Sequence, residues 1–263
     1  MSFKHIVSRD NPVFKHLKKL ADNARERRSE GQTLLDGVHL IEAYITAFGE
    51  PTMVIIPEGQ SSVEATGLIQ ALEHVSTMML PTLMFAELTP VASATGILAL
   101  VKIPQINIPQ SPSFVLMLED IQDPGNLGSI LRTAAAAGVE VVYLSTSCTD
   151  AWSPKALRGG QGAQFILPVV ARADLILELE NFNGNSYATT IQGESLYLQD
   201  FTQATAFVIG NEGGGLRKQT ISATTKSITI PMVESSMGSV ESLNAGAAAA
   251  VCLFERMRQT TVI

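Results

Sequence analysis

Three segments of the sequence place polar side chains or glycines directly after an apolar run. They are residues 126–132 (NLGSILR), residues 210–215 (GNEGGG) and residues 230–244, which open with Ile-Pro-Met and close with Ser-Leu-Asn. Open α/β sheets bind their ligands at the carboxyl ends of the strands, where loops of this kind meet. We therefore expect the three segments to contribute to one ligand site.

The first segment holds one cation in an otherwise small and apolar stretch. Arg132 follows Asn126 by six residues. A guanidinium group is planar and always charged, which suits it to binding phosphate, although an arginine here could equally face solvent. Asn126 follows an Asp-Pro-Gly turn, so its side chain could simply cap the helix that it opens.

The second segment is rich in glycine, which lets the backbone approach a ligand closely. Two well-known phosphate-binding patterns do not fit it. A phosphate loop requires Lys-Ser or Lys-Thr where Leu216-Arg217 stands, and no G-x-G-x-x-G dinucleotide pattern occurs here. Glu212 is either an acidic turn residue or a working carboxylate.

The third segment runs into an alanine-rich helix that begins near Ser242 or Asn244. Both residue types are common N-caps, so capping is the simplest interpretation of each. The start of a helix is also electropositive and offers free N–H groups to a polar ligand.

The elements that must position these segments alternate between strands and helices. In the first part of the chain we expect helices over residues 12–28, 37–48 and 62–74 and strands over residues 33–35 and 53–57. In the second part we expect strands over residues 114–118, 139–144, 165–170, 187–191, 207–209 and 228–230, and helices over residues 127–137 and 245–258. Apolar runs without alternation indicate strands covered on both faces. The pattern predicts an α/β protein whose larger sheet is mostly parallel, with helices on both faces.

Three prolines in residues 104–112 prevent a regular helix and favour an extended linker. We therefore predict a small N-terminal α/β domain over residues 1–103 and a C-terminal domain over residues 113–263.

The composition excludes several classes of protein. Hydrophobic residues make up 46% of the 263 residues, yet no apolar run approaches the ~18 to 20 residues of a membrane span. The N-terminus shows no secretory signal, and Cys148 and Cys252 have no metal-binding spacing. We predict buried free thiols, a cytoplasmic location, and neither a metal nor a membrane partner.

The net charge of −7 argues weakly against a nucleic-acid partner, but the charge is unevenly distributed. Residues 1–31 hold eight Lys or Arg against four Asp or Glu. This basic end either follows a phosphate backbone or is the solvated face of a helix.

Taken together and in this order, the three segments resemble the SpoU (TrmH) family of the SPOUT superfamily, which are S-adenosylmethionine-dependent RNA ribose 2′-O-methyltransferases. The matching elements are Asn-x-Gly-x-x-x-Arg, Gly-x-Glu-Gly and Ile-Pro-Met followed by Ser-Leu-Asn. Residues 163–168 (AQFILP) also resemble the family's Gly-Ala-x-Phe-x-Leu-Pro stretch. Residues 31–57 loosely resemble the RNA substrate-binding domain that precedes the catalytic domain in many members.

The resemblance implies a deep trefoil knot in the catalytic domain, a homodimer and S-adenosyl-L-methionine as cofactor. The implied cofactor-binding residues are Gly210, Ile230, Met232 and Leu243. The implied catalytic positions are Asn126, Arg132, Glu212, Ser242 and Asn244. Residues 233–241 make the last loop longer than is typical of the family. The predicted substrate is 23S-type large-subunit rRNA. The alternatives are a tRNA ribose 2′-O-methyltransferase and a non-catalytic RNA-binding protein of ribosome assembly.

The implied reaction moves a methyl group from a sulfonium to a ribose hydroxyl, which must lose its proton. All four histidines precede the predicted linker: His5, His16, His39 and His74. We predict that Arg132 orients a substrate phosphate and helps to activate the hydroxyl, either as a base or, in the form that we prefer, through the phosphate. Asn126, Ser242 and Asn244 would position the substrate and the loop. A nucleotide-dependent oxidoreductase is disfavoured because neither phosphate-binding pattern is present.

Overall fold

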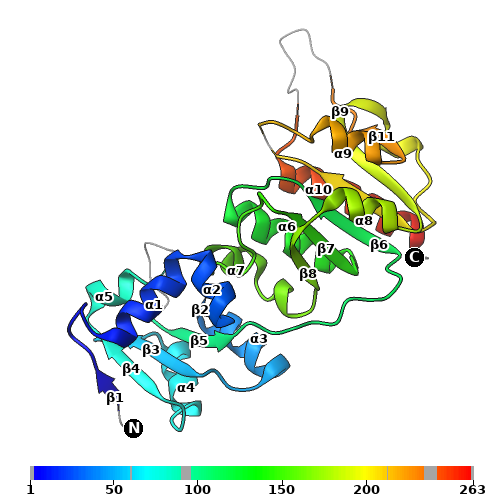
Figure 1. Cartoon of the computed structure of the whole chain (residues 1–263). Coiled ribbons are helices and arrows are strands. Elements are labelled where there is room, and N and C mark those ends of the chain that lie inside the picture. Colours follow the sequence, from blue (N-terminus) through cyan, green and yellow to red (C-terminus); the bar gives the residue numbers. More distant parts are fainter. Residues whose placement is uncertain (1–2, 60, 90–95, 212, 234–241, 262–263) are drawn as a thin grey trace. The chain divides into compact units, whose positions relative to one another are not determined.

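The computed structural model describes residues 3–59, 61–89, 96–211, 213–233 and 242–261 (Figure 1). The chain divides into two compact units. The first unit contains Met1–Gln105 and Trp152–Phe165, and the second contains Ile106–Ala151 and Ile166–Ile263.

The first unit is built on a five-stranded mixed sheet in the order β1-β4-β3-β5-β2. Strands β1, β4 and β3 are parallel, whereas β5 runs antiparallel to both β3 and β2. Its strands are β1 (Phe3–His5), β2 (Gln32–Asp36), β3 (Met53–Pro57), β4 (Thr77–Leu80) and β5 (Leu98–Lys102). Its helices are α1 (Pro12–Asp22), α2 (Ala24–Glu30), α3 (Val38–Phe48), α4 (Val63–Ala71), α5 (Thr82–Ala86), α7 (Pro154–Gly160) and the 3-10 helix η1 (Ala163–Phe165).

Both faces of this sheet are covered. One hydrophobic cluster joins the sheet to α3, α4 and α7, and a second cluster joins it to α1 and α5. The neighbouring residues Leu34 and Leu35 belong to different clusters, because successive side chains of a strand point to opposite faces. The predicted small α/β module is therefore correct.

The single helix predicted over residues 12–28 is wrong, because α1 ends at Asp22 and α2 begins at Ala24. Between them Asn23 is extended, with φ −122° and ψ 113°, and its side chain accepts a hydrogen bond from Arg25 N. Asparagine competes with the helical backbone in this way. The buried Arg27 then donates to the carbonyls of Leu20 and Ala21, at 2.6 and 3.0 Å, which stabilises the end of α1.

The segment Trp152–Phe165 belongs to the first unit, although the predicted domain boundaries assign it to the second domain. Leu157 and Phe165 join the hydrophobic cluster of α3 and α4, and Thr33 Oγ1 donates to the carbonyl of Trp152 at 2.7 Å. The strand predicted over residues 165–170 is also wrong. Ala163–Phe165 form the 3-10 helix η1, and all three residues are buried. The next strand begins at Val169.

The second unit contains a six-stranded sheet in the order β11-β9-β10-β6-β7-β8, and all its strand pairs are parallel. The strands are β6 (Phe114–Leu118), β7 (Val141–Ser145), β8 (Val169–Ala173), β9 (Asn185–Ser195), β10 (Thr205–Ile209) and β11 (Lys226–Thr229). The helical elements are α6 (Pro124–Ala136), α8 (Leu175–Asn181), the 3-10 helix η2 (Leu196–Leu198), α9 (Lys218–Ala223) and α10 (Ala245–Thr260). The prediction of a mostly parallel larger sheet is confirmed.

Helices cover both faces of this sheet (Figure 1). Helices α8 and α9 share a hydrophobic cluster with Val115, Met117 and Val208. Helices α6 and α10 pack against each other on the opposite face, where the Arg256 guanidinium lies 4.0 Å from the centre of the Phe114 ring. The predicted knot stays a prediction, because residues 234–241, which precede the C-terminal helix, lie outside the described residues. Among the residues that are described, no helix combines the length and apolarity needed to cross a membrane.

Candidate active site

A cavity of ≈ 440 Å³ lies at the carboxyl ends of strands β10 and β11 and beside the middle of β9. This volume falls within the usual range of small-molecule sites. Four stretches form most of the lining: Thr189–Ile191 at the middle of β9, residues 209–216 around the glycine loop (apart from residue 212), Thr229, Ile230 and Met232 at and just after the end of β11, and Ser242, Leu243, Ala245 and Ala248 around the start of α10. Asn244, predicted to be catalytic, is not among the described lining residues. The parallel sheet has brought together the second and third of the three predicted segments, whereas the first, residues 126–132, contributes no described residue to the lining.

All the residues predicted to bind the cofactor line this one cavity: Gly210, Ile230, Met232 and Leu243. Ser242, predicted to be catalytic, lines it as well and is exposed. Glu212 and residues 234–241, which include most of the long loop, lie outside the described residues.

The glycine loop is held in shape by Asn211. The Asn211 Oδ1 atom accepts hydrogen bonds from the N–H groups of Gly213 and Gly214, at 2.7 and 3.0 Å. Its Nδ2 atom donates to the carbonyl of Asp120 at 2.8 Å. The loop closes on itself, since a Cβ atom on Gly210 would lie 2.4 Å from the carbonyl carbon of Gly215. Glycine is therefore required at residue 210 by the loop's own backbone.

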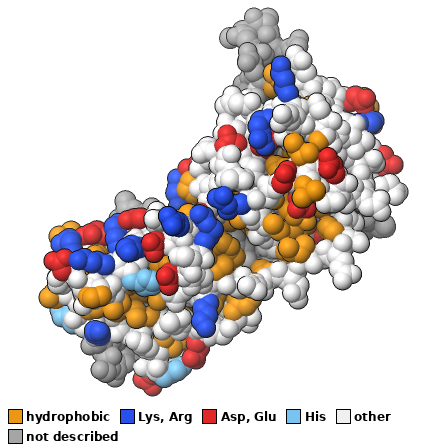
Figure 2. Space-filling model, viewed as in Figure 1, with side chains coloured by type: hydrophobic (Ala, Val, Ile, Leu, Met, Phe, Trp, Pro, Cys, Tyr) orange, Lys and Arg blue, Asp and Glu red, His pale blue; other side chains and the backbone are white. Residues whose placement is uncertain are grey.

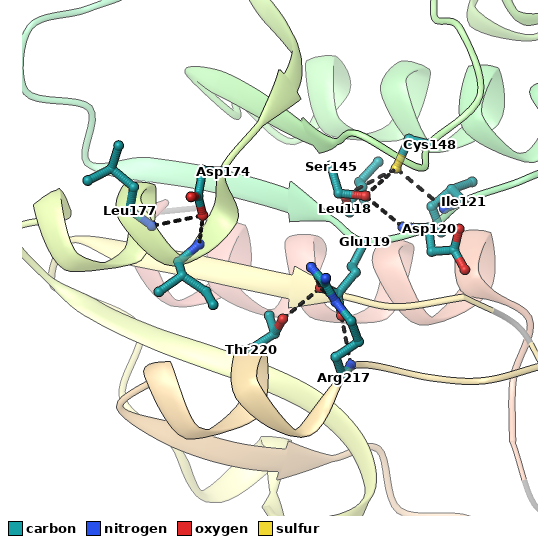
Figure 3. Close-up of polar contacts among 11 residues, drawn as sticks. Leu118, Glu119, Asp120, Ile121, Ser145, Cys148, Asp174, Leu177, Arg217 and Thr220 are labelled. Atoms are coloured by element: carbon teal, nitrogen blue, oxygen red, sulfur yellow. Dashed lines mark hydrogen bonds and ion pairs between the residues drawn. The ribbon is translucent and has the colours of Figure 1, made fainter.

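A buried carboxylate fixes the other end of this loop (Figure 3). Glu119, only 1% exposed, directly follows β6. It accepts hydrogen bonds from the backbone N–H of Arg217 at 2.7 Å, from Arg217 Nε at 2.8 Å and from Thr220 Oγ1 at 2.6 Å. A buried carboxylate is costly unless it is paired and hydrogen-bonded, and these donors meet that requirement.

The loop between β6 and α6 prepares the helix that carries Asn126 and Arg132. Asp123 is the N-cap of α6, and its side chain accepts from Asn126 N at 2.8 Å. The interpretation of Asn126 as the cap is therefore wrong. The helix begins earlier than predicted, because proline is favourable in the first turn and Pro124 follows the capping aspartate. Asn126 lies inside that first turn.

Arg132 is exposed on α6, and Ser129 and the half-exposed Asn126 precede it at intervals of three residues. The three side chains form a polar stripe along the solvent side of the helix. Asn126 and Arg132 do not belong to the cavity lining among the described residues. The exposed Arg132 is accessible to a large ligand that approaches from outside the cavity.

Asn244 is the N-cap of α10, and its Oδ1 atom accepts from Ala247 N at 2.7 Å. The capping interpretation of Asn244 is confirmed, and that of Ser242 is wrong because Ser242 lies two residues before the cap.

Sequence reasoning missed several residues of this site. Thr189, Thr190 and Thr229 line the cavity, and Asn211 and Glu119 shape the glycine loop. A signal existed for Thr189 and Thr190, which are polar residues within the strand predicted over residues 187–191 and follow the buried Tyr187 and Ala188.

Both cysteines are free thiols, as predicted. Burial raises the pKa of the Cys252 thiol to about 12. The Cys148 thiol is partly buried, and burial raises its pKa despite hydrogen bonds with Ser145 and Ile121. Both thiols are therefore protonated at neutral pH and are poor nucleophiles. Within the described part of the chain, no group of three His, Cys, Asp or Glu side chains could hold a metal ion.

Comparison with known proteins identifies the family. The sequence model of the SpoU rRNA Methylase family matches residues 113–254. The chain belongs to this family. The match confirms the predicted family and the predicted enzyme class, an RNA methyltransferase.

Similar proteins cover nearly the whole chain. An uncharacterized tRNA/rRNA methyltransferase of Synechocystis is 34% identical over 97% of this chain and 93% of its own length. The 23S rRNA (guanosine(2553)-2′-O)-methyltransferase RlmP of Bacillus subtilis is 31% identical over 95% of this chain and 98% of its own. The crystal structure of the SpoU methyltransferase AviRb from Streptomyces viridochromogenes, in complex with the cofactor AdoMet, has a TM-score of 0.80 and 27% identity, and the match covers 95% of this chain and 98% of that one.

Proposed function

We propose that this protein is an S-adenosylmethionine-dependent methyltransferase that acts on a ribose 2′-hydroxyl of large-subunit rRNA. The observation that carries the proposal is the convergence of Gly210, Ile230, Met232 and Leu243 on one cavity at the carboxyl edge of the parallel sheet. Membership of the SpoU rRNA methylase family, the name of the Bacillus subtilis relative and the AdoMet complex of AviRb all support it.

The lining of the cavity suits a nucleoside with an amino-acid tail. Ile209, Ile230 and Leu243 offer apolar surface for a purine ring, and the threonines of β9 and the glycine loop offer hydrogen-bonding groups. A few polar groups in a mostly apolar pocket are typical of cofactor sites. When bound, S-adenosylmethionine supplies an electrophilic methyl group on a sulfonium.

The exposed Arg132 is suited to hold the RNA. We place a phosphate of the substrate on its guanidinium group, which can donate two parallel hydrogen bonds to phosphate oxygens. A phosphate fixed beside the 2′-hydroxyl can assist the loss of its proton, whereas a permanently charged guanidinium cannot accept that proton. The capping bond of Asn244 uses Oδ1, so a contact of Asn244 with substrate would come from its Nδ2 donor.

The first unit is proposed to bind a second part of the same RNA. Lys19, Arg25 and Arg28 are exposed on α1 and α2, and no carboxylate among the described residues forms an ion pair with them. Figure 2 shows Lys and Arg side chains along these helices, with acidic side chains between them. Exposed basic side chains of this kind bind phosphate in a salt-dependent way. We further propose a cytoplasmic homodimer, as the family resemblance implies.

The test is tritium transfer from labelled S-adenosylmethionine to total RNA from cells that lack this gene, followed by separation of the RNA by size and mapping of 2′-O-methyl nucleotides. Wild type is expected to label one position of large-subunit rRNA. Arg132→Ala should lower the rate by about 10²–10³-fold, while it still binds S-adenosylhomocysteine. Arg132→Lys keeps the charge but not the planar pair of donors, and should fall between the two.

Each other outcome has a defined meaning. Label in tRNA alone would mean that the substrate is tRNA and not large-subunit rRNA. Binding of S-adenosylhomocysteine without label in any RNA would favour a non-catalytic RNA-binding protein. Full turnover by Arg132→Ala would exclude the proposed role of this arginine.

A further inference from the structure

The glycine loop that lines the cavity is anchored by two neighbouring residues, one at each of its ends. Asn211 at its start donates from Nδ2 to the carbonyl of Asp120 at 2.8 Å. Arg217 at its end binds Glu119 through its backbone N–H at 2.7 Å and through Nη2 at 2.7 Å. Glu119 and Asp120 are neighbours directly after β6, so one dipeptide holds both ends of the loop. Figure 3 shows the contact of Glu119 with Arg217.

The burial of Glu119 points to a role beyond packing. Its side chain is 2% exposed, whereas that of Arg217 is 65% exposed. A buried ion pair is a weak contributor to stability, because the desolvation of the carboxylate offsets much of the attraction. What this arrangement does provide is geometry, because Glu119 receives backbone and guanidinium donors from Arg217 and a hydroxyl donor from Thr220, both just after the loop.

Asp120 adds a second sign of function. Its φ of 59° lies in the left-handed region, which is unfavourable for a residue other than glycine and is found preferentially at functional sites. This conformation is held by the N–H of Asp120, which donates to Ser145 Oγ at 3.0 Å, while its carbonyl accepts from Asn211.

The segment that begins with Glu119 and Asp120 also leads into α6, the helix that carries the proposed RNA-binding residue Arg132. Three residues after Asp120, Asp123 caps α6, and α6 carries Asn126 and Arg132. The first two residues of the segment 119–123 therefore hold the glycine loop, and its last residue caps the helix that we propose to bind RNA.

We propose that Glu119 and Asn211 are positioning residues: they clamp the glycine loop to the end of β6 and so keep the methyl-donor cavity in its binding shape. Neither residue is proposed to react. The inference rests on the proposed function, because it assigns the cavity to S-adenosylmethionine.

Two variants each break one end of the clamp with a minimal change. Glu119→Gln keeps the size of the side chain but turns an amide N–H₂ group toward the donors of Arg217 or Thr220. Asn211→Asp keeps the oxygen that accepts from Gly213 and Gly214, but sets a second carboxylate oxygen against the carbonyl of Asp120 in place of the donor.

Thr205→Val is the matched control. Thr205 is 1% exposed and lies at the opposite end of β10, where its hydroxyl donates to the carbonyl of Gln203 at 2.9 Å. The variant removes one buried polar contact from the same strand without touching the loop.

The experiment is calorimetric titration of S-adenosylhomocysteine into the full-length wild type and the three variants, at a temperature where circular dichroism shows all of them folded. We expect Glu119→Gln and Asn211→Asp to raise Kd by about tenfold or more, and Thr205→Val to leave it within about twofold of wild type. Amide hydrogen exchange of residues 210–217 should rise in the two clamp variants only.

The outcomes separate this inference from the proposed function. If wild type binds and both clamp variants bind equally well, the clamp is overturned and the proposed function stands. If Thr205→Val weakens binding as much as they do, the effect is one of general stability and the clamp is again overturned. Absence of binding in wild type overturns the proposed function and the clamp with it.

Discussion

The two units of this protein contain sheets of similar size but different strand directions, and the cavity described above lies at the all-parallel sheet of the second unit. In the first unit, β5 runs antiparallel to β3 and β2, so the carboxyl ends of its strands lie at both edges of the sheet. In the second unit every pair is parallel, so the loops after all the strands emerge at one edge. Strand direction is what allows the loops that follow β10 and β11 to share one cavity beside the middle of β9.

The two units also differ in how they complete their cores. The second unit is formed by segments that surround residues 152–165 on both sides in the sequence, whereas the first unit takes that segment into its own core. Leu157, with 0% exposure, packs in the cluster of α3 and α4. A division of the chain at the proline-rich segment alone would leave the first unit without part of its core.

The largest effect on ligand binding is expected from a substitution in the glycine loop, at the carboxyl edge of the parallel sheet. Gly210→Ala places a Cβ atom 2.4 Å from one backbone atom of Gly215 and 2.6 Å from Leu216 N, so the glycine loop must move. We expect binding of S-adenosylhomocysteine to weaken by about 100-fold or more, measured by calorimetry.

Gly67→Ala is the control for this variant, because Gly67 lies in α4, outside the described cavity lining, and a Cβ atom there meets nothing within 4 Å. It should bind within about threefold of wild type. If both glycine variants bind normally, the loop does not shape the donor site.

A second prediction tests the shared core of the first unit. Leu157→Ala removes a fully buried side chain and should lower the free energy of unfolding of this unit by about 2–5 kcal/mol. Hydrogen exchange should accelerate in β2 and β5 and stay unchanged in β6 and β10.

The reverse pattern is expected for Leu253→Ala in α10, which is also 0% exposed but belongs to the second unit. Equal acceleration in both units for either variant would mean that the two cores unfold as one.

The smallest effect concerns the start of α10. Asn244→Ala removes the bond from Ala247 N to Oδ1 and should cost about 1 kcal/mol of stability, measured by urea unfolding. Asn244→Asp keeps a capping oxygen and should retain that stability. If methyl transfer falls in Asn244→Asp while stability is kept, Asn244 serves the reaction as well as the helix. If activity follows stability in both variants, its role is capping alone.

The buried elements of the second unit could be predicted from the sequence. Strand β6 matches the predicted residues 114–118, and α10 starts at the predicted residue 245. Strand β6 is an unbroken apolar run, as a strand covered on both faces requires. Helix α10 begins with an alanine-rich run, which allows close packing. The second and third polar segments of the sequence also predicted Gly210, Ile230, Met232, Ser242 and Leu243, which meet in the cavity, whereas Asn126, Arg132 and Asn244 are not among its described lining residues.

The failures have physical causes that a local pattern does not contain. Asn23 interrupts an otherwise continuous amphipathic run because its side chain caps a second helix. Short helices such as α7 and α9 depend on tertiary contacts, since isolated helices of this length are not stable. The clamp at Glu119 joins residues 98 positions apart, and no spacing rule connects a strand-end glutamate to a distant arginine.

The most direct test of the account is a crystal structure of the protein with S-adenosylhomocysteine at saturating concentration. The account predicts ligand density in the cavity between Thr189–Ile191, the glycine loop and the segment that begins α10, in contact with Gly210 and Leu243. Ligand density at any other place on the chain, or an empty cavity in crystals of protein that binds the ligand in solution, would contradict it.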